Sequence, residues 1–211
     1  MKMIILIIIM MMVGIGCAYI NLPIEGEYRY THNLNEGGKI REIPIWIDIK
    51  FGEGDRIEIV KAIEDWNYAM NGKIELRIVD FEFNEEGEKV VSQIRKNGWI
   101  IRKIDSSSRF IPGVEKGFHT LGFVERVGGN HLYLIRDRLK NEEVFGVVLH
   151  EIGHLMGSGH VGDRLMAPHY SIAGNQCIDL ITIMMVAKYN GTSINGLNYC
   201  YDTTMGDSKK N

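Results

Sequence analysis

HEIGHLMGSGH, at residues 150–160, is the most informative stretch of this chain. It matches the pattern H-E-x-x-H-x-x-G-x-x-H at every fixed position, with His150, His154 and His160 in the three histidine places. Two histidines four residues apart, with a glutamate directly after the first, form an arrangement that binds zinc beside a carboxylate. The stretch therefore predicts a metal centre whose ligand set is completed by a third histidine.

A helix is expected over residues 141–157, with the asparagine that opens it as N-cap. Apolar residues recur there at steps of three or four and few charges interrupt them, which indicates a central, largely buried helix. Residues four apart lie on one face of a helix, so His150 and His154 can bind one ion together. Gly157 stands where the helix should end, and a turn at this glycine can bring His160 back toward the same ion.

Glu151 directly follows the first histidine, so its side chain points roughly 100° away from the ligand face. Three neutral imidazoles leave the double charge of zinc intact and one position open for water, whose pKa falls to about 7. Glu151 can take the proton of that water and is expected to be a general base. A helix that merely buries two histidines is the alternative. Gly153, a poor helix former, indicates a close approach of another backbone.

At these residues the chain resembles the metzincin metallopeptidases, and within them the matrixin-type catalytic domain. The resemblance implies a zinc-dependent endopeptidase with one catalytic zinc ion and a protein or peptide substrate. It also implies an α/β (α+β) fold with a twisted, mostly parallel sheet, an active-site helix and a C-terminal helix, and the zinc in a cleft between two subdomains. The matching residues of the motif are His150, Glu151, His154, Gly157 and His160.

The resemblance continues into the segment after the motif. Met166 matches the methionine of the family's Met-turn, which packs beneath the zinc ligands, and Pro168 and Tyr170 continue the pattern L-M-x-P-x-Y. By this resemblance Tyr170 lies near the site, as a wall of the specificity pocket or as a helper at the oxyanion, and plain packing is the alternative. The spacing from His160 to Met166 is shorter than is typical, which predicts a tight loop.

Two further features of the family are not matched. His119 and His131 do not have the spacing of a second, structural zinc site, and solvated or strand-end histidines are expected there. We find no cysteine-switch motif for latency. Calcium binding stays undecided, because the aspartates form no recognisable calcium loop; the ones considered are Asp48, Asp55, Asp105, Asp137 and Asp163.

The order of the expected elements predicts an α/β domain. The strand at 120–126 is, by the family resemblance, the edge strand that pairs with an extended substrate. Met184 and Met185 in the last helix are expected to fill the core. The expected strands are 44–51, 73–83, 99–104, 120–126 and 131–137, and the expected helices are 55–70, opened by a capping box of Asp55 and Glu58, a short one within 85–97, 141–157 and 178–189.

Composition predicts one catalytic domain behind a targeting segment. The chain has 211 residues and a net charge of −3, so it lacks the basic footprint of a nucleic-acid-binding protein. We also expect a monomer. The expected segments are a signal peptide or lipoprotein signal at 1–18, a linker or N-terminal extension at 19–43, the catalytic domain at 44–191 and a C-terminal tail at 192–211.

Residues 3–13 are continuously apolar and follow Lys2, as in the first two regions of a signal peptide. The residues before Cys17 resemble a bacterial lipobox, which predicts a lipid on this cysteine. Ordinary cleavage after Ala18 is the second alternative. An uncleaved anchor helix is the third, since no charge occurs between Lys2 and Glu25. The first two export the protein, as a cell-envelope lipoprotein or a secreted protein, and the first and third attach it to a membrane.

The other two cysteines are expected to pair. If a lipid occupies Cys17, then Cys177 and Cys200 can form a disulfide in an oxidising compartment, and two free thiols are the alternative.

Two classes of function follow from the sequence. The first is a zinc endopeptidase of the cell envelope or extracellular space, with Glu151 as general base. The second is a zinc-containing surface lipoprotein that binds a partner without cleaving it. Glu151 favours the first, because a purely structural zinc site has no need of that carboxylate and usually closes its fourth position.

Overall fold

The computed structural model describes residues 28–33, 40–79, 98–113, 119–170 and 176–202. The predicted short helix within 85–97 and the N-terminal segment with Cys17 lie outside these residues. The described strands are β1 (Tyr28–Tyr30), β2 (Arg41–Ile47), β3 (Ile74–Ile78), β4 (Trp99–Ile104), β5 (Gly122–Val124), β6 (His131–Ile135) and β7 (Cys200–Asp202). The described α-helices are α1 (Glu53–Met70), α3 (Val144–Leu155) and α4 (Leu180–Asn190), and two 3-10 helices, Arg136–Arg138 and Asn141–Glu143, precede α3.

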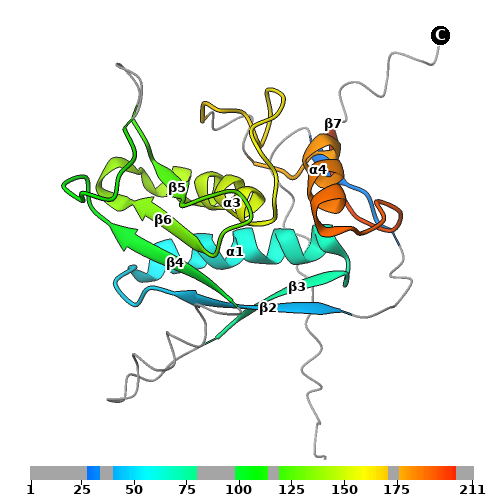
Figure 1. Ribbon diagram of the computed structural model, residues 1–211, viewed down its shortest axis with the longest axis horizontal. Helices are drawn as coiled ribbons and strands as arrows, with labels where there is room; N and C mark the ends of the chain where they lie inside the picture. The colour runs from blue at the N-terminus through cyan, green and yellow to red at the C-terminus, as the bar shows by residue number, and fades with distance from the viewer. Residues whose placement is uncertain (1–27, 34–39, 80–97, 114–118, 171–175, 203–211) are drawn as a thin grey trace, which may run out of the picture.

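Five of the described strands form one sheet in the order β3-β2-β4-β6-β5 (Figure 1). β2 pairs in parallel with β3 and β4, and β4 pairs in parallel with β6. β5 is antiparallel to β6 and lies at the edge. The prediction of a mixed α/β fold with a mostly parallel sheet is therefore confirmed, and the predicted strand at 120–126 is the edge strand.

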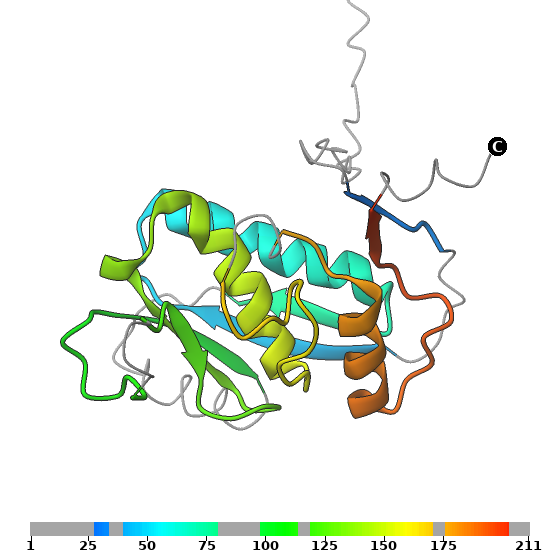
Figure 2. The ribbon, with the colours of Figure 1, turned by 90° about the horizontal axis from the view of Figure 1, so that it is seen from above.

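Helices α1 and α3 pack against each other and cover the same face of this sheet (Figures 1 and 2). In the predicted strand 44–51, Ile45, Ile47 and Ile49 alternate onto one side; Ile45 and Ile47 are buried as this predicts. Ile49 lies beyond the end of β2 and is 59% exposed. The fully buried Trp66 of α1 donates a hydrogen bond from Nε1 to the carbonyl oxygen of Leu149 in α3, at 3.0 Å. The sheet thus supports α1, and α1 fixes the position of the helix that carries the motif.

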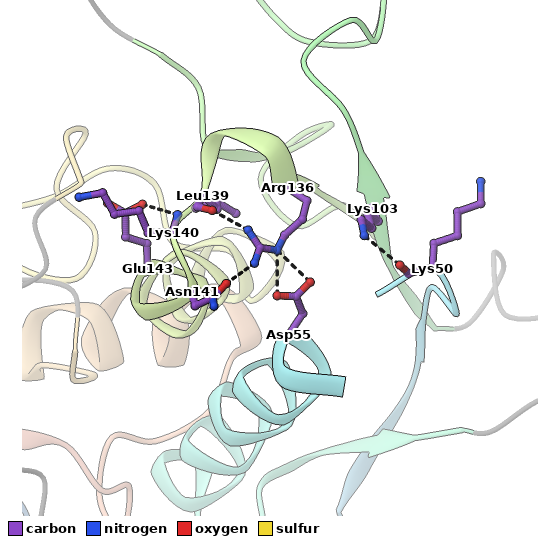
Figure 3. Close-up of polar contacts among 8 residues, drawn as sticks. All are labelled: Lys50, Asp55, Lys103, Arg136, Leu139, Lys140, Asn141 and Glu143. Carbon is purple, nitrogen blue, oxygen red and sulfur yellow. Dashed lines mark hydrogen bonds and ion pairs between the residues drawn. The ribbon is translucent and has the colours of Figure 1, made fainter. Parts of the chain in front are cut away.

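The predicted capping residues of both helices are wrong. α1 begins at Glu53 after Gly52, without a side-chain cap. Asp55 instead accepts hydrogen bonds on both carboxylate oxygens from Nε of Arg136, each at 2.8 Å (Figure 3). Arg136 also donates to Oδ1 of Asn141, so this asparagine does not cap α3 either. The largely buried guanidinium of Arg136 donates to all of these oxygens, and each such hydrogen bond is strengthened by its charge. Arg136 therefore joins the start of α1 to the segment before α3.

The flanking segments 19–43 and 192–211, predicted as linker and tail, each contain a strand. β1 pairs antiparallel with β7 to form a second, two-stranded sheet beside α4 (Figure 2). A disulfide joins Cys177 and Cys200, whose Cα atoms lie 6.0 Å apart. Three-residue strands carry too little periodicity to be recognised in the sequence.

The prediction that Met184 and Met185 fill the core is wrong. Met184 is 51% exposed and Met185 is 37% exposed, because the buried stripe of α4 runs through Thr182, Ile183 and the following turn instead. Helix α4 was correctly predicted as an element, but a helix that is apolar all round gives no signal for which side is buried. Within the described part of the chain, no helix combines the length and apolar character needed to cross a membrane.

Candidate metal centre

Helix α3 presents the first two histidines of the motif on one face. The ring centroids of His150 and His154 lie 4.7 Å apart, with the ring planes nearly perpendicular. His154 is buried and His150 is partly buried, because α3 lies in the centre of the molecule between α1 and strands β5 and β6. The four-residue spacing therefore produces the expected pair of adjacent imidazoles.

The third histidine is brought back by the turn that ends α3. Gly157 has φ +98°, which favours glycine. Its N–H donates to the carbonyl oxygen of His154 at 3.0 Å, and the N–H of Ser158 donates to that of Gly153 at 2.9 Å. This pair of bonds is the Schellman motif, which reverses the chain after a helix. As a result Nε2 of His160 lies 3.2 Å from Nε2 of His154.

The three imidazoles form a compact group with one open side. The ring of His160 lies 5.5 Å from that of His150 and 4.8 Å from that of His154, between centroids. One nitrogen of each ring lies within 4.8 Å of the corresponding nitrogens of the other two. His160 is exposed, so solvent reaches the group from its side.

Backbone carbonyls orient the two helical histidines. Nδ1 of His150 lies against the carbonyl oxygen of Leu165, and Nδ1 of His154 lies 2.8 Å from that of Ser158. A carbonyl accepts but cannot donate, so each Nδ1 carries the proton and each Nε2 keeps a free lone pair for a metal. This arrangement is typical of histidines that bind a metal.

The electrostatic setting keeps the rings neutral. Burial, followed by the nearby charge of His154, lowers the pKa of His150 to about 4. Burial also lowers the pKa of His154. For His160, burial and then the charge of His169 lower the pKa. Neutral imidazoles need not lose a proton before they bind a cation.

Glu151, which follows His150 in the chain, carries a buried carboxyl group. It is 6% exposed, and its Oε2 atom has no hydrogen-bond partner among the described residues. Burial raises its pKa to about 8. The edge strand lies directly against it, since a Cβ on Gly122 would be 3.2 Å from Cγ of Glu151 and 2.9 Å from Cγ1 of Val147. An uncompensated buried carboxyl group is costly, and a nearby divalent cation would stabilise its ionised form.

Met166 lies beneath the motif, and the loop that leads to it is tight as predicted. The N–H of Val161 donates to the carbonyl oxygen of Met166 at 2.9 Å and closes the loop. A Cβ on Gly153 would lie 2.5 Å from Sδ of Met166 and 3.5 Å from Cζ2 of Trp66. The approach predicted at Gly153 is therefore made by side chains and not by another backbone.

The residues after Met166 differ in their exposure. Pro168 and His169 are exposed. Tyr170 is partly buried against the core, and its pKa rises to about 12 through burial and the charges of Glu143 and Glu142. This places Tyr170 toward the start of α3. No described contact joins it to the three histidines.

His119 and His131, which lack the spacing of a second zinc site, do not join the group of three histidines. His119 is exposed. His131 in β6 contacts Oδ1 of Asn130 at 2.8 Å and lies 3.7 Å from Oε2 of Glu125. Among the described residues, the three motif histidines are the one group of three or more His, Cys, Asp or Glu side chains that could hold a metal ion together. The sequence analysis missed Gly122, although a glycine inside a strand pattern signals a close approach.

The donor set fits zinc. Zinc binds imidazole nitrogen readily, and its catalytic sites use three protein ligands with a fourth position open. Here three neutral imidazoles converge, two of them oriented by carbonyls, and the residue after the first, Glu151, has a buried carboxyl oxygen without a partner among the described residues. His150, His154 and His160 are therefore the residues that would hold the ion.

No protein-family model and no curated protein sequence matches the chain. Among solved structures, archaemetzincin from Methanopyrus kandleri is similar at 13% identity and a TM-score of 0.45, over 72% of this chain and 96% of that one. Metalloproteinase-II from Bacteroides fragilis is similar at 15% identity and a TM-score of 0.44, over 75% of this chain and 54% of that one. High choriolytic enzyme 1, a hatching enzyme zinc-protease from Oryzias latipes, is 21% identical with a TM-score of 0.28, over 56% and 44% of the two chains. All three TM-scores lie below 0.5, so these similarities carry no conclusion about the function of this chain.

Proposed function

We propose that this protein is a zinc-dependent endopeptidase in which His150, His154 and His160 hold the ion and Glu151 is the general base. One observation carries the proposal: three imidazoles converge, and Glu151, the residue after the first of them, has a buried carboxyl oxygen without a partner among the described residues. A site that only stabilised the fold would not need that carboxyl group.

The chain's own residues account for the proton transfers. When bound, zinc supplies a Lewis acid that polarises a carbonyl group and makes water more acidic. Glu151 accepts a proton from the attacking water and donates it to the leaving amine. The carbonyls of Leu165 and Ser158 keep the Nδ1 protons of the two helical histidines in place, so that both Nε2 atoms stay available.

The edge strand supports a peptide substrate. Among the described strands β5 pairs with β6 alone, so its other side can pair with an extended peptide. Gly122 of this strand lies against Glu151, so a peptide paired with β5 would run past the carboxyl group. Within this proposal we assign the protein to the matrixin-like metzincins, on the strength of Gly157, Met166 and Pro168 in the motif.

The place of action is proposed from the sequence. The apolar residues 3–13 and Cys17 support an exported protein, either lipid-anchored at the cell envelope or secreted. The Cys177–Cys200 disulfide is in keeping with an oxidising compartment. The protein is proposed to act as a monomer on protein or peptide substrates, without nucleic acid.

The test is metal analysis combined with Glu151→Gln. Wild-type protein should hold one zinc ion and cleave internal bonds of a peptide library. Glu151→Gln should hold the same amount of zinc and lose at least about a hundredfold in kcat/KM, because the general base is gone. Cleavage by the variant at the wild-type rate would reject Glu151 as the base. A wild-type protein that holds zinc and cleaves nothing would favour a non-catalytic surface protein.

A further inference from the structure

The last turn of α4 lies against the turn that ends α3. A Cβ on Gly157 would be 2.0 Å from Cγ and Cδ1 of Tyr189 and 2.7 Å from its Cβ. Of these atoms, Cβ is fixed by the backbone of α4, and Cγ and Cδ1 can move only by rotation about the Cα–Cβ bond. The side chain of Tyr189 therefore fills the space beside Gly157 and fixes the position of this turn.

The hydroxyl end of the same tyrosine reaches a second turn. A Cβ on Gly128, between β5 and β6, would be 1.9 Å from Oη of Tyr189. The N–H of Gly128 donates to the carbonyl oxygen of His154 at 2.8 Å, and the N–H of Gly157 donates to the same oxygen at 3.0 Å. Tyr189 thus contacts two turns, and a backbone N–H of each turn donates to the carbonyl oxygen of His154, a candidate ligand.

Asn190 makes a third connection from α4 to the end of α3. Its Nδ2 donates to the carbonyl oxygen of Met156 at 2.8 Å, and Met156 is the C-cap of α3. Its Oδ1 accepts from Arg41 at 3.0 Å, which fixes the orientation of the amide. A helix C-terminus leaves carbonyls without partners inside the helix, and this one is satisfied by α4.

The turn held in this way controls two of the three candidate ligands. Ser158 directly follows Gly157, and its carbonyl orients Nδ1 of His154. His160 follows two residues later, between this turn and the loop that the Val161–Met166 hydrogen bond closes, so the turn is one of two restraints on its position. A shift of the Gly157 turn would therefore move His160 and rotate His154 together.

From these contacts we propose that Tyr189 and Asn190 are positioning residues of the metal centre. They act through the Gly157 turn and do not touch the ion or the substrate. The proposal rests on the proposed function, since it requires that the three histidines bind zinc. Tyr189 is 57% exposed, so its truncation removes little buried area, and a loss of metal affinity can be separated from a loss of stability.

The experiment compares Tyr189→Ala and Asn190→Ala with Met184→Ala, a control at an exposed position of the same helix. Zinc affinity is measured by competition with a chromophoric chelator, and ligand geometry by the visible spectrum of the cobalt-substituted protein. Tyr189→Ala and Asn190→Ala should each weaken zinc binding roughly tenfold or more, as is usual for residues that orient ligands. Tyr189→Phe keeps the ring and should stay within about threefold of wild type.

The cobalt spectrum distinguishes positioning from general loosening of the fold. The spectrum of Tyr189→Ala should shift toward that of His160→Ala, and Tyr189→Ala should add little to the loss of affinity when His160 is already replaced. Met184→Ala should leave the affinity and the spectrum unchanged. If Tyr189→Ala does not fold, Asn190→Ala is judged by the same measurements.

Two results would overturn the proposal in different ways. If wild-type protein binds zinc and His160→Ala weakens it, but Tyr189→Ala and Asn190→Ala match Met184→Ala, the positioning role is rejected and the proposed function stands. If wild-type protein binds neither zinc nor cobalt, the proposed function fails and the positioning role fails with it.

Discussion

Gly153 shows how a single missing methyl group shapes this site. A Cβ there would lie 2.5 Å from Sδ and 3.1 Å from Cε of the fully buried Met166. Alanine is a better helix former than glycine by about 1 kcal/mol, but overpacking a core costs about 1–3 kcal/mol. We expect the packing to win, because Met166 is fully buried in the core.

The prediction at this position is a loss of stability. Gly153→Ala should lower the free energy of unfolding by about 1 kcal/mol in urea denaturation of the metal-free protein. Gly54→Ala in α1 is the matched control, since nothing lies within 4 Å of its added Cβ, and it should be neutral or stabilising. A stabilised Gly153→Ala variant would show that Met166 is not held in place.

Asp65 provides a prediction on pH. Burial raises its pKa to about 6, although Tyr30 donates a hydrogen bond to it at 3.4 Å. Folded Asp65 therefore binds a proton more readily than the unfolded chain does, so the folded state loses stability as the pH rises from about 4 to about 6. Asp65→Asn removes this loss and should be more stable than wild type at pH 7.5.

The difference between Asp65→Asn and wild type should shrink as the pH falls toward 4. Urea denaturation at pH 4.5 and pH 7.5 measures it, with Asp163→Asn at an exposed aspartate as control. A difference that is the same at both pH values would show that the ionisation of Asp65 is not its cause.

At the scale of elements, α1 and the approach to α3 are joined by the Asp55–Arg136 pair (Figure 3). The two side chains are 10% and 21% exposed, so removing one leaves the other charge largely without water. Arg136→Met should lower the free energy of unfolding by about 3 kcal/mol. Arg77→Met breaks the exposed pair with Glu42 and should cost less than about 1 kcal/mol. Equal effects of the two changes would contradict the structural role of Arg136.

The edge strand and the motif helix meet at Gly122. A Cβ there would press on Glu151 and Val147, so Gly122→Ala should displace the carboxyl group while the histidines stay in place. We expect kcat/KM to fall about tenfold with zinc content unchanged, because small displacements of a catalytic group are expensive. Gly113→Ala, with nothing within 4 Å, is the control. Loss of zinc together with activity would mean that the change disturbs the whole site.

At the scale of the whole molecule, the disulfide ties the segment before α4 to β7. Cys177 and Cys200 are 23 residues apart, and closing a loop of this length stabilises the folded state by about 3 kcal/mol. The double variant Cys177→Ser and Cys200→Ser should lose about this much in urea denaturation and keep its zinc. Unchanged stability would mean that the bond constrains nothing in the unfolded chain.

The sequence was most informative where the chemistry requires a fixed spacing. The four-residue interval of His150 and His154, with the turn at Gly157, predicted three histidines that do lie together. The alternation of β2 also predicted the buried side of Ile45 and Ile47, because alternation is a local property. The mostly parallel sheet was expected from the family resemblance and not from periodicity.

What the sequence could not show depends on contacts between distant segments. Asp55 has the spacing of a capping residue, but a partner more than eighty residues away takes its carboxylate. Met184 and Met185 face solvent because neighbouring elements set the buried side of α4. The contact of Tyr189 with Gly157 joins residues whose sequence neighbourhoods have nothing in common.

The pairing of β1 with β7 means that the described chain enters and leaves at one spot. Tyr28 lies opposite Asp202 in this pairing, and Figure 2 shows both strands at the same corner of the molecule. Antiparallel partners lie about 5 Å apart, so a short peptide could bridge these two positions. A circularly permuted protein, joined there and opened at an exposed loop, should keep its histidine cluster. An attachment made through the segment before Tyr28 or through the segment after Asp202 would therefore hold the folded domain at the same corner.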